Sequence, residues 1–240
     1  MKYELLKNMI EKSRRICVFT GAGISCPSGI PDFRSADGLY NRESKYRYSP
    51  EEIISHSFFY GHTDLFYDFY KSAMLYPDAK PNAAHLYFAG LEQKGKDVTV
   101  VTQNIDGLHQ AAGSQNVIEL HGSVHRNYCT KCKKSFSLEY IKNSKGIPRC
   151  DCDSAVIKPD VVLYEEPLDP KAIEAAISAV ENADTLIVVG TSLVVYPAAS
   201  FVRYFGGDNL VIINKSDTSL DKRASLIFNE DVTDVIKKIR

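Results

Sequence analysis

Short apolar runs alternate along the chain with longer stretches that have helical periodicity. Runs rich in valine and isoleucine occupy residues 16–20, 98–102, 185–189 and 210–214. Stretches with apolar positions spaced as on one face of a helix include residues 65–75, 83–93 and 171–181. Uninterrupted apolar runs are typical of parallel strands that are buried on both faces. The pattern therefore predicts an α/β fold with a mostly parallel sheet and helices on both of its faces.

Two segments interrupt this alternation. Residues 35–80 hold a tyrosine-rich, charged loop followed by helix-like sequence, which is too long for an ordinary connection and predicts a lid or a small module. Residues 124–160 contain four of the six cysteines. The sequence therefore predicts one sheet domain assembled from residues 1–34, 81–123 and 161–240, with these two segments as insertions.

The composition is that of an ordinary globular chain. Of the 240 residues, 44% are hydrophobic and 25% are charged, and the formal net charge is −1. A net charge this close to zero gives no electrostatic support for nucleic-acid binding. Charged residues interrupt the first 15 positions, so we expect no signal peptide or membrane span there. These features predict a cytoplasmic protein with no nucleic-acid and no membrane partner.

The four cysteines of the second insertion have metal-site spacing. Cys129 and Cys132 form a C-x2-C pair, and Cys150 and Cys152 form a C-x-C pair after a gap of seventeen residues. In a reducing compartment, clustered thiols are more typical of a metal site than of disulfides. Four cysteine ligands would make a zinc ion structural rather than catalytic. The C-x-C pair is one residue shorter than the usual zinc turn, and four unligated thiols are the alternative.

A glycine-rich turn follows the first apolar run. Residues 20–34 read TGAGISCPSGIPDFR, so Gly21 and Gly23 match a G-x-G-x-x-G phosphate-binding turn, but Cys26 takes the place of the third glycine. The chain also lacks the strand ending in Asp or Glu about 20 residues later that ordinarily binds the adenosine ribose. The turn therefore favours a phosphate-bearing ligand and disfavours an ordinary NAD-dependent oxidoreductase.

Polar residues follow other strands at the edge where parallel sheets bind ligands. Residues 102–109 read TQNIDGLH, and Asn104 and Asp106 could recognise the carboxamide and ribose of a nicotinamide nucleotide. An Asx-rich turn that caps the next helix is the alternative for this stretch. His121 ends an alternating strand, where a lone histidine is more often a packed residue than a general base.

Taken together, these motifs resemble those of the sirtuins, a family of NAD-dependent protein lysine deacylases. The turn at residues 20–34, the TQNIDGLH motif, the His121-Gly122 pair, the four cysteines and GTSLVVYPA at residues 190–198 occur in the family's order. The resemblance spans nearly the whole chain. It implies a Rossmann-like sheet with a small zinc-ribbon module and a helical lid.

The resemblance also implies roles for individual residues. The catalytic residues would be His121, as the base, and Asn104. The NAD-binding positions would be Gly21, Ala22, Gly23, Cys26, Asp32, Phe33, Arg34, Gln103, Asn104, Ile105, Asp106, His121, Gly190, Thr191, Ser192, Asn214, Asp231 and Val232. The substrate peptide would pair by strand addition with Val161, Val162, Leu163 and Tyr164, and would face Val194. The structural zinc ligands would be Cys129, Cys132, Cys150 and Cys152.

By the same resemblance, an acyl-lysine side chain enters an apolar tunnel, and its amide oxygen attacks the anomeric carbon of NAD as nicotinamide leaves. His121 then takes a proton from the ribose hydroxyls so that the 2′-oxygen can attack the acyl carbon. Water completes the release of lysine and 2′-O-acyl-ADP-ribose. Asp32, Phe33 and Arg34 would belong to the loop that closes over the nicotinamide side.

Desuccinylating sirtuins carry a Tyr-x-x-Arg pair in the lid, whereas here Tyr67 is followed by Tyr70 at the arginine position. The resemblance therefore implies an acyl pocket at Tyr67 and Tyr70 that accepts acetyl-lysine of a protein or peptide, with a longer apolar acyl chain as an alternative. The family usually reads Phe-Gly-Glu where this chain has Tyr164-Glu165-Glu166, and the added negative charge predicts a preference for basic peptide flanks. We expect a monomer.

Other functions are compatible with parts of the sequence. A zinc-ribbon interaction module without catalysis explains the cysteines but not Asn104, Asp106 and His121. Protein mono-ADP-ribosyl transfer would use the same NAD chemistry with a different acceptor. The motifs as a set favour NAD-dependent removal of acetyl from lysine side chains, which gives nicotinamide, free lysine and 2′-O-acetyl-ADP-ribose.

Overall fold

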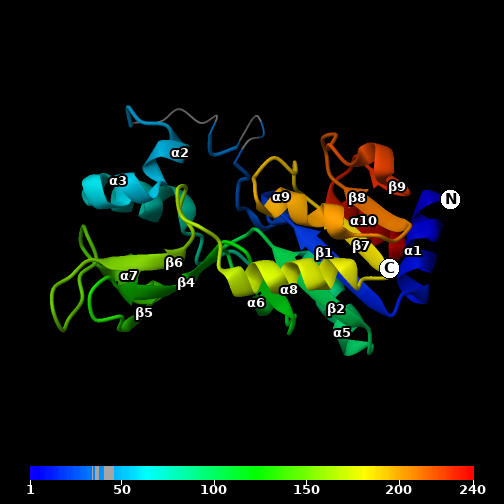
Figure 1. Cartoon of the computed structure of the whole chain (residues 1–240), viewed down its shortest axis with the longest axis horizontal. Helices are drawn as coiled ribbons and strands as arrows, with labels where there is room; N and C mark the ends of the chain where they lie inside the picture. The colour runs from blue at the N-terminus through cyan, green and yellow to red at the C-terminus, as the bar shows by residue number, and fades with distance from the viewer. Residues whose placement is uncertain (34, 36–37, 41–45) are drawn as a thin grey trace.

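The computed structural model describes residues 1–33, 35, 38–40 and 46–240. Within these residues, the larger sheet has six strands in the order β3-β2-β1-β7-β8-β9, and the neighbouring strands in this order are all parallel (Figure 1). The strands are β1 (Arg15–Thr20), β2 (Asp97–Thr102), β3 (Val117–Glu119), β7 (Thr185–Val189), β8 (Asn209–Ile213) and β9 (Leu226–Phe228). The predicted parallel sheet is confirmed, and the four apolar runs correspond to β1, β2, β7 and β8.

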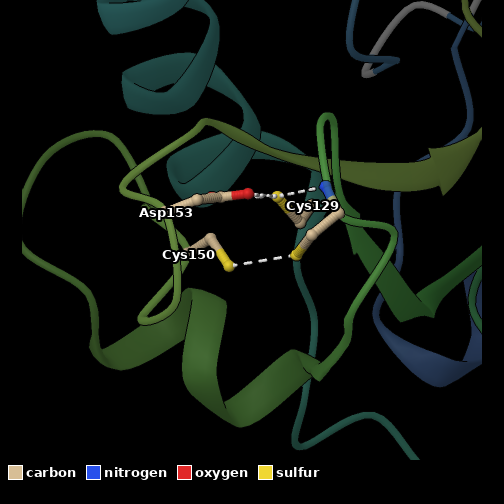
Figure 2. A group of neighbouring side chains, drawn as sticks. Cys129, Cys150 and Asp153 are labelled. Atoms are coloured by element: carbon tan, nitrogen blue, oxygen red, sulfur yellow. Dashed lines mark hydrogen bonds between the residues drawn. The ribbon is translucent and has the colours of Figure 1, made fainter.

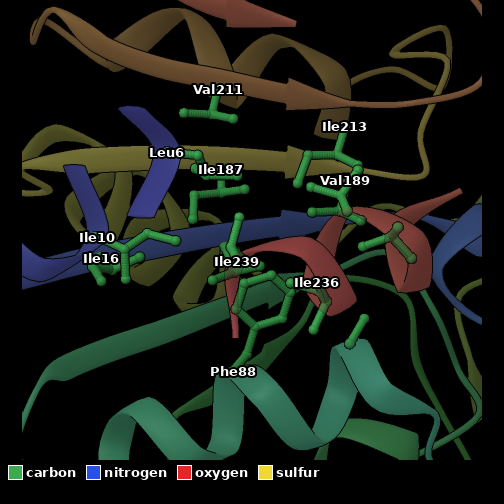
Figure 3. Close-up of a cluster of buried hydrophobic side chains, with 14 of the residues drawn as sticks. Leu6, Ile10, Ile16, Phe88, Ile187, Val189, Val211, Ile213, Ile236 and Ile239 are labelled. Atoms are coloured by element: carbon green, nitrogen blue, oxygen red, sulfur yellow. The ribbon is translucent and has the colours of Figure 1, made fainter. Parts of the chain in front are cut away.

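Helices cover both faces of this sheet because successive side chains of a strand point to opposite faces. Ile16 and Val18 of β1 pack in one hydrophobic cluster, while Cys17 and Phe19 pack in another. The first cluster is covered by α1 (Lys2–Lys12), α5 (Ala83–Gln93) and α10 (Val232–Ile239), and Figure 3 shows its side chains meeting between these helices and the sheet. The second is covered by α8 (Pro170–Glu181) and α9 (Ala198–Phe201).

A smaller unit lies beyond one end of the sheet, at the left of Figure 1. It contains an antiparallel sheet in the order β5-β4-β6. Its elements are α2 (Pro50–Ile53), α3 (His56–Gly61), α4 (Thr63–Phe69), β4 (Gly122–Cys129), β5 (Ser135–Ser137), α7 (Leu138–Asn143) and β6 (Ile157–Val161). A π-helical turn, Tyr70–Met74, continues α4, so the expected helix over residues 65–75 changes its hydrogen-bond pattern at Tyr70.

The two sequence insertions share one hydrophobic core. Phe59 and Phe66 from the helical insertion belong to the same buried cluster as Phe136, Ile141 and Ile157 from the cysteine-bearing insertion. The side chains of Phe59, Phe66 and Ile157 are fully buried. The expected domain limits at residues 35, 81, 124 and 161 stay a prediction.

The remaining short elements lie in the connections. They are α6 (Leu108–Ala111) and the 3-10 turns Ala22–Ile24, Cys26–Ser28, Val202–Tyr204 and Asp221–Arg223. None of the helices in the described part of the chain combines the length and the apolar character that a membrane crossing requires.

Candidate functional site

A cleft of about 250 Å³ opens where the large sheet meets the smaller unit. Its wall is formed by the loops that follow β1, β2 and β3, and by the segment that leaves β6. Of the predicted site residues, it brings together Ala22, Phe33, Gln103, Asn104, Ile105, Asp106, His121, Val161, Val162, Leu163 and Tyr164. The carboxyl ends of parallel strands are where such sheets bind ligands.

His121 lies just beyond β3, and the backbone fixes its tautomer. Its Nδ1 is 2.8 Å from the carbonyl oxygen of Gln103. Because a carbonyl oxygen only accepts, Nδ1 carries the proton and Nε2 keeps a free lone pair. Burial lowers the pKa of His121, and the hydrogen bond to Gln103 opposes this shift. The imidazole is therefore held neutral at neutral pH, in the form that can accept a proton.

A chain of hydrogen bonds links the first two strand ends. The amide of Asn104 donates to the hydroxyl oxygen of Ser25 at 3.1 Å, and the Ser25 hydroxyl donates to a carboxylate oxygen of Asp106 at 2.7 Å. The other carboxylate oxygen of Asp106 accepts from the Leu108 N–H at 2.9 Å, so the Asx turn weighed in the sequence is also formed. These bonds hold an amide and a carboxylate together in one polar patch of the cleft.

The glycine turn after β1 is in backbone contact with the turn after β7. The Gly21 N–H donates to the Val189 carbonyl at 3.0 Å, and the Gly23 N–H donates to the Gly190 carbonyl at 2.8 Å. A Cβ atom added at Gly23 would lie 2.7 Å from the Cα of Gly190, and Gly190 itself has a φ of +59°. Only glycine permits this approach. Gln103 completes the contact by donating its amide to the Thr191 hydroxyl at 3.1 Å.

The residues expected at the adenosine side lie at the ends of β7 and β8 and the start of α10. Ser192 is exposed after β7, and the Asn214 amide donates to the Ser216 carbonyl at 2.7 Å. Asp231 caps α10 by accepting from the Thr233 N–H at 2.9 Å. It also forms a 3.0 Å ion pair with Lys215.

Three further residues predicted to bind NAD are Val232, Cys26 and Arg34. Val232 is 5% exposed. The Cys26 sulfur is 3.9 Å from a carboxylate oxygen of Asp32, and burial, with a smaller effect of Asp32, raises the pKa of Cys26. Arg34 lies outside the described residues.

The segment predicted to bind a peptide runs along the cleft as an extension of β6. The Val162 N–H donates to the His121 carbonyl at 3.0 Å, and the Tyr164 N–H donates to the Ile54 carbonyl at 3.0 Å. Val194 is 54% exposed and does not line the described cleft, whereas its neighbours Val195 and Tyr196 do.

Tyr67 and Tyr70, expected in the acyl pocket, are instead part of the smaller unit's core. Both are at most 1% exposed, and neither is among the described residues that line the cleft. The Tyr67 hydroxyl donates to the Ile157 carbonyl, which fixes its ring against β6. Ala73 and Met74, later in the π-helical turn that begins at Tyr70, do line the cleft.

The cysteine cluster differs from the expected ligand set in one residue. The sulfurs of Cys129, Cys132 and Cys150 and a carboxylate oxygen of Asp153 all lie within 4.8 Å of one another. Figure 2 shows Asp153 pointing toward Cys129. Cys152 is exposed and is not part of this group; with Cys150 and Asp151 it forms a second one. The assignment of Cys152 to the zinc ion therefore stays a prediction.

Comparison with known proteins decides the family. A family model described as the Sir2 family matches residues 21–197. The chain belongs to the Sir2 family. A curated relative from Clostridium acetobutylicum, named NAD-dependent protein deacetylase, is 53% identical over 239 residues, covering 99% of this chain and 98% of the relative.

Solved structures agree with this assignment. A Sir2 variant with a deacetylated p53 peptide and 3′-O-acetyl ADP ribose has a TM-score of 0.90 and 42% identity, covering 100% of this chain and 97% of that one. A Sir2 complex with a p53 peptide and NAD+ has a TM-score of 0.87 and 42% identity over the same shares. The resemblance drawn from the motifs is confirmed.

The motif analysis of this Sir2-family chain missed two polar residues of the cleft. Ser25 joins Asn104 to Asp106, and His125 has its Nε2 3.0 Å from the Asp106 carbonyl oxygen. Ser25 lies between Gly23 and Cys26, so its place in the glycine turn was an available signal. His125 is exposed on β4, and no motif marked it as a residue of the site.

Proposed function

We propose that this Sir2-family chain is an NAD-dependent protein lysine deacetylase. It removes acetyl groups from lysine side chains of proteins and peptides, giving nicotinamide, free lysine and 2′-O-acetyl-ADP-ribose. The observation that carries the proposal is the neutral, backbone-held imidazole of His121 in a cleft that also contains Ser25, Asn104 and Asp106. Full-length similarity to an NAD-dependent protein deacetylase supports it.

NAD is a co-substrate of this reaction and supplies the ADP-ribose unit that accepts the acetyl group. The linked groups of Ser25, Asn104 and Asp106 fit a ligand with a carboxamide and ribose hydroxyls, because they offer both donors and acceptors. We assign orientation of the nicotinamide ribose to Asn104 and Asp106. His121 Nε2 would take a proton from a ribose hydroxyl, as a general base.

The phosphates and the adenosine would lie along the neighbouring strand ends. The glycine turn at residues 21–23 and the turn at Gly190, Thr191 and Ser192 are the backbone segments available to the phosphates. Asn214, Asp231 and Val232 follow β8 and β9, where we assign the adenosine. Phe33 lines the cleft beside the nicotinamide position.

The charge of the cleft favours a neutral acyl group over a succinyl group. Its described lining contains Asp106, Glu165 and Glu166 but no lysine or arginine. Lys71, next to the tyrosine pair, directs its ammonium group to the carbonyl oxygens of Ser144 and Gly146 at 2.7 and 2.9 Å. Acetyl-lysine would therefore enter beside the apolar side chains of the cleft, and the peptide would pair with residues 161–164.

Two further assignments accompany this function. A structural zinc ion would tie together the two cysteine-bearing turns of the smaller unit, and it takes no part in the chemistry. We also place the protein in the cytoplasm, as a monomer that acts on acetylated proteins.

The test is a product analysis on an acetyl-lysine peptide with NAD. Mass spectrometry would follow free lysine peptide, nicotinamide and 2′-O-acetyl-ADP-ribose, with His121→Ala as the control. We expect the three products in equal amounts with the wild-type protein, and at least about a hundredfold less of each with the control.

Other outcomes point to the alternatives. NAD consumption without deacetylation indicates ADP-ribosyl transfer or a longer acyl substrate, which a panel of acyl peptides separates. No NAD consumption by folded, zinc-loaded protein across that panel contradicts an enzymatic function and favours an interaction module.

A further inference from the structure

The geometry of the cysteine cluster matches a tetrahedral metal site with one oxygen ligand. Around a zinc ion, sulfur ligands at 2.3 Å lie about 3.8 Å apart, and a sulfur and an oxygen ligand lie about 3.5 Å apart. The sulfurs of Cys132 and Cys150 are 3.6 Å apart. The Cys129 sulfur is 3.3 and 3.6 Å from the two carboxylate oxygens of Asp153. These two pairs are therefore already spaced as ligands of one ion, and all four ligand atoms lie within 4.8 Å of one another.

The first turn of the cluster has a defined backbone pattern. The Cys129 N–H donates to the Lys134 carbonyl at 2.9 Å, and the Lys133 N–H donates to the Cys129 carbonyl at 3.2 Å. Lys133 has a φ of +64°. The N–H groups of Lys131 and Cys132 each lie 3.4 Å from the Cys129 sulfur. The first and fourth residues of this turn, Cys129 and Cys132, both point to the cluster.

The second turn repeats this pattern residue by residue. The Cys150 N–H donates to the Ala155 carbonyl at 2.8 Å, and the Ser154 N–H donates to the Cys150 carbonyl at 3.0 Å. Ser154 has a φ of +58°. The Cys152 N–H lies 3.4 Å from the Cys150 sulfur, as the Lys131 N–H does from Cys129. The fourth residue of this turn is Asp153, and Cys152 takes the outward position of Lys131.

We propose that Asp153, and not Cys152, is the fourth ligand of the structural zinc ion, so that the site is Cys129, Cys132, Cys150 and Asp153. An aspartate oxygen is an established zinc ligand, and three thiolates with one carboxylate carry the same charge as four thiolates. Cys152 is then a free surface thiol, 3.8 Å from the Lys134 ammonium nitrogen. The proposal concerns metal binding alone and does not depend on the enzymatic activity.

Thiol labelling of the zinc-loaded full chain tests the assignment directly. Cys132 and Cys152 are both exposed, so exposure alone would let both react with a maleimide. We expect Cys152 to be labelled and Cys132 to be protected until a chelator removes the zinc, as located by peptide mass spectrometry. Protection of Cys152 that is lost together with the zinc would overturn the proposal.

Two matched variants provide a second test by native mass spectrometry and chelator competition. We expect Cys152→Ala to keep one zinc per chain with an affinity within about twofold of wild type. Asp153→Ala should lose at least about tenfold in affinity, since disturbing even the outer shell of a zinc site costs that much. The reverse ranking of the two variants would overturn the proposal.

Cobalt(II) substitution covers the case in which Asp153→Ala does not fold. Thiolate-to-cobalt absorbance reports the number of sulfur ligands. We expect Cys152→Ala to leave the wild-type absorbance unchanged, and Asp153→Cys to raise it by about one third, from three thiolates to four. A loss of absorbance in Cys152→Ala would show that Cys152 is a ligand.

Discussion

The imidazole of His121 is oriented by a backbone carbonyl, that of Gln103, at 2.8 Å from Nδ1. A carboxylate in this place would raise the pKa of the imidazole by its charge. A neutral carbonyl fixes the same tautomer with a weaker effect, so burial dominates and the pKa of His121 is lowered. The arrangement keeps the base unprotonated while its geometry stays fixed.

The first prediction concerns the pH dependence of deacetylation. Because a lowered pKa delays protonation as the pH falls, the acid limb of kcat/KM should lie below pH 6.5, about the pKa of an ordinary imidazole. His121→Ala should lower kcat/KM by about 10²- to 10⁴-fold. Rate measurements over pH 5–9 check both, with thermal unfolding as the folding control. An acid limb above pH 6.5 would contradict the prediction.

The second prediction separates steric overlap from backbone strain at glycine. Gly190 and Gly146 both have positive φ, +59° and +63°, so alanine at either position is strained by about 1–2 kcal/mol. Only at Gly190 would the added Cβ also overlap the backbone of Gly23 and Ile24; at Gly146 nothing lies within 4 Å. Gly190→Ala should therefore lose clearly more unfolding free energy than Gly146→Ala in urea titrations. Equal losses of unfolding free energy in the two variants would mean that the turn at Gly190 can move away from the turn at Gly23 and relieve the overlap.

The large sheet could be predicted from the sequence because its central strands are long apolar runs. The run at residues 185–189 has the limits of β7, and residues 83–93 have the limits of α5. The sequence did not indicate β5 and β9, which have three residues each and depend on pairing with a neighbouring strand. Short strands carry little periodicity of their own.

The candidate site was predictable where backbone turns and polar residues coincide, as at Asn104 and Asp106. It was not predictable where a side chain's direction depends on packing. Tyr70 lies on a π-helical turn and stacks on Phe66, which carries it into the core. Counting sulfurs assigns Cys152 to the metal, whereas the hydrogen bonds of the turn at Cys150 support our proposal of Asp153 in its place.

The third prediction concerns stability in acid. His85 and His109 are buried with their rings 4.8 Å apart, and burial lowers their pKa values to about 4 and about 3. Between those values and the unfolded pKa of about 6.5, the unfolded chain binds more protons, so stability falls as the pH falls. The unfolding free energy should drop from pH 7 to pH 5 by roughly 2 kcal/mol per histidine.

Urea titrations of two glutamine variants at pH 7 and pH 5 check this. His109→Gln should make the fall in unfolding free energy between pH 7 and pH 5 smaller by roughly 2 kcal/mol, the contribution of one histidine. The reason is that the substitution removes a group that, in this pH range, is protonated only in the unfolded state. His62→Gln, at an exposed histidine, should leave the drop unchanged. An unchanged drop in His109→Gln would show that other groups control acid unfolding.

The last prediction concerns the charge beside the peptide segment. Glu165 lines the cleft and has a φ of +75°. Its carboxylate accepts from the Ser57 hydroxyl at 2.6 Å and from the Ser57 N–H at 2.8 Å, and these bonds lower the pKa of Glu165. It is therefore ionised at neutral pH. Acetyl-lysine peptides with lysine or arginine flanks should have a kcat/KM about two- to fivefold above those with acidic flanks, as expected for an exposed charge pair.

Two variants at this position separate charge from backbone effects. Glu165→Gln keeps the side-chain shape and removes the charge, so it should abolish the flank preference, and raised salt should weaken that preference in the wild type. Glu165→Gly also removes the side chain from a left-handed backbone position, so it should abolish the preference without the strain that glutamine keeps. Equal rates on both peptides in the wild type, or a preference that survives in Glu165→Gln, would mean that the carboxylate does not act on the peptide.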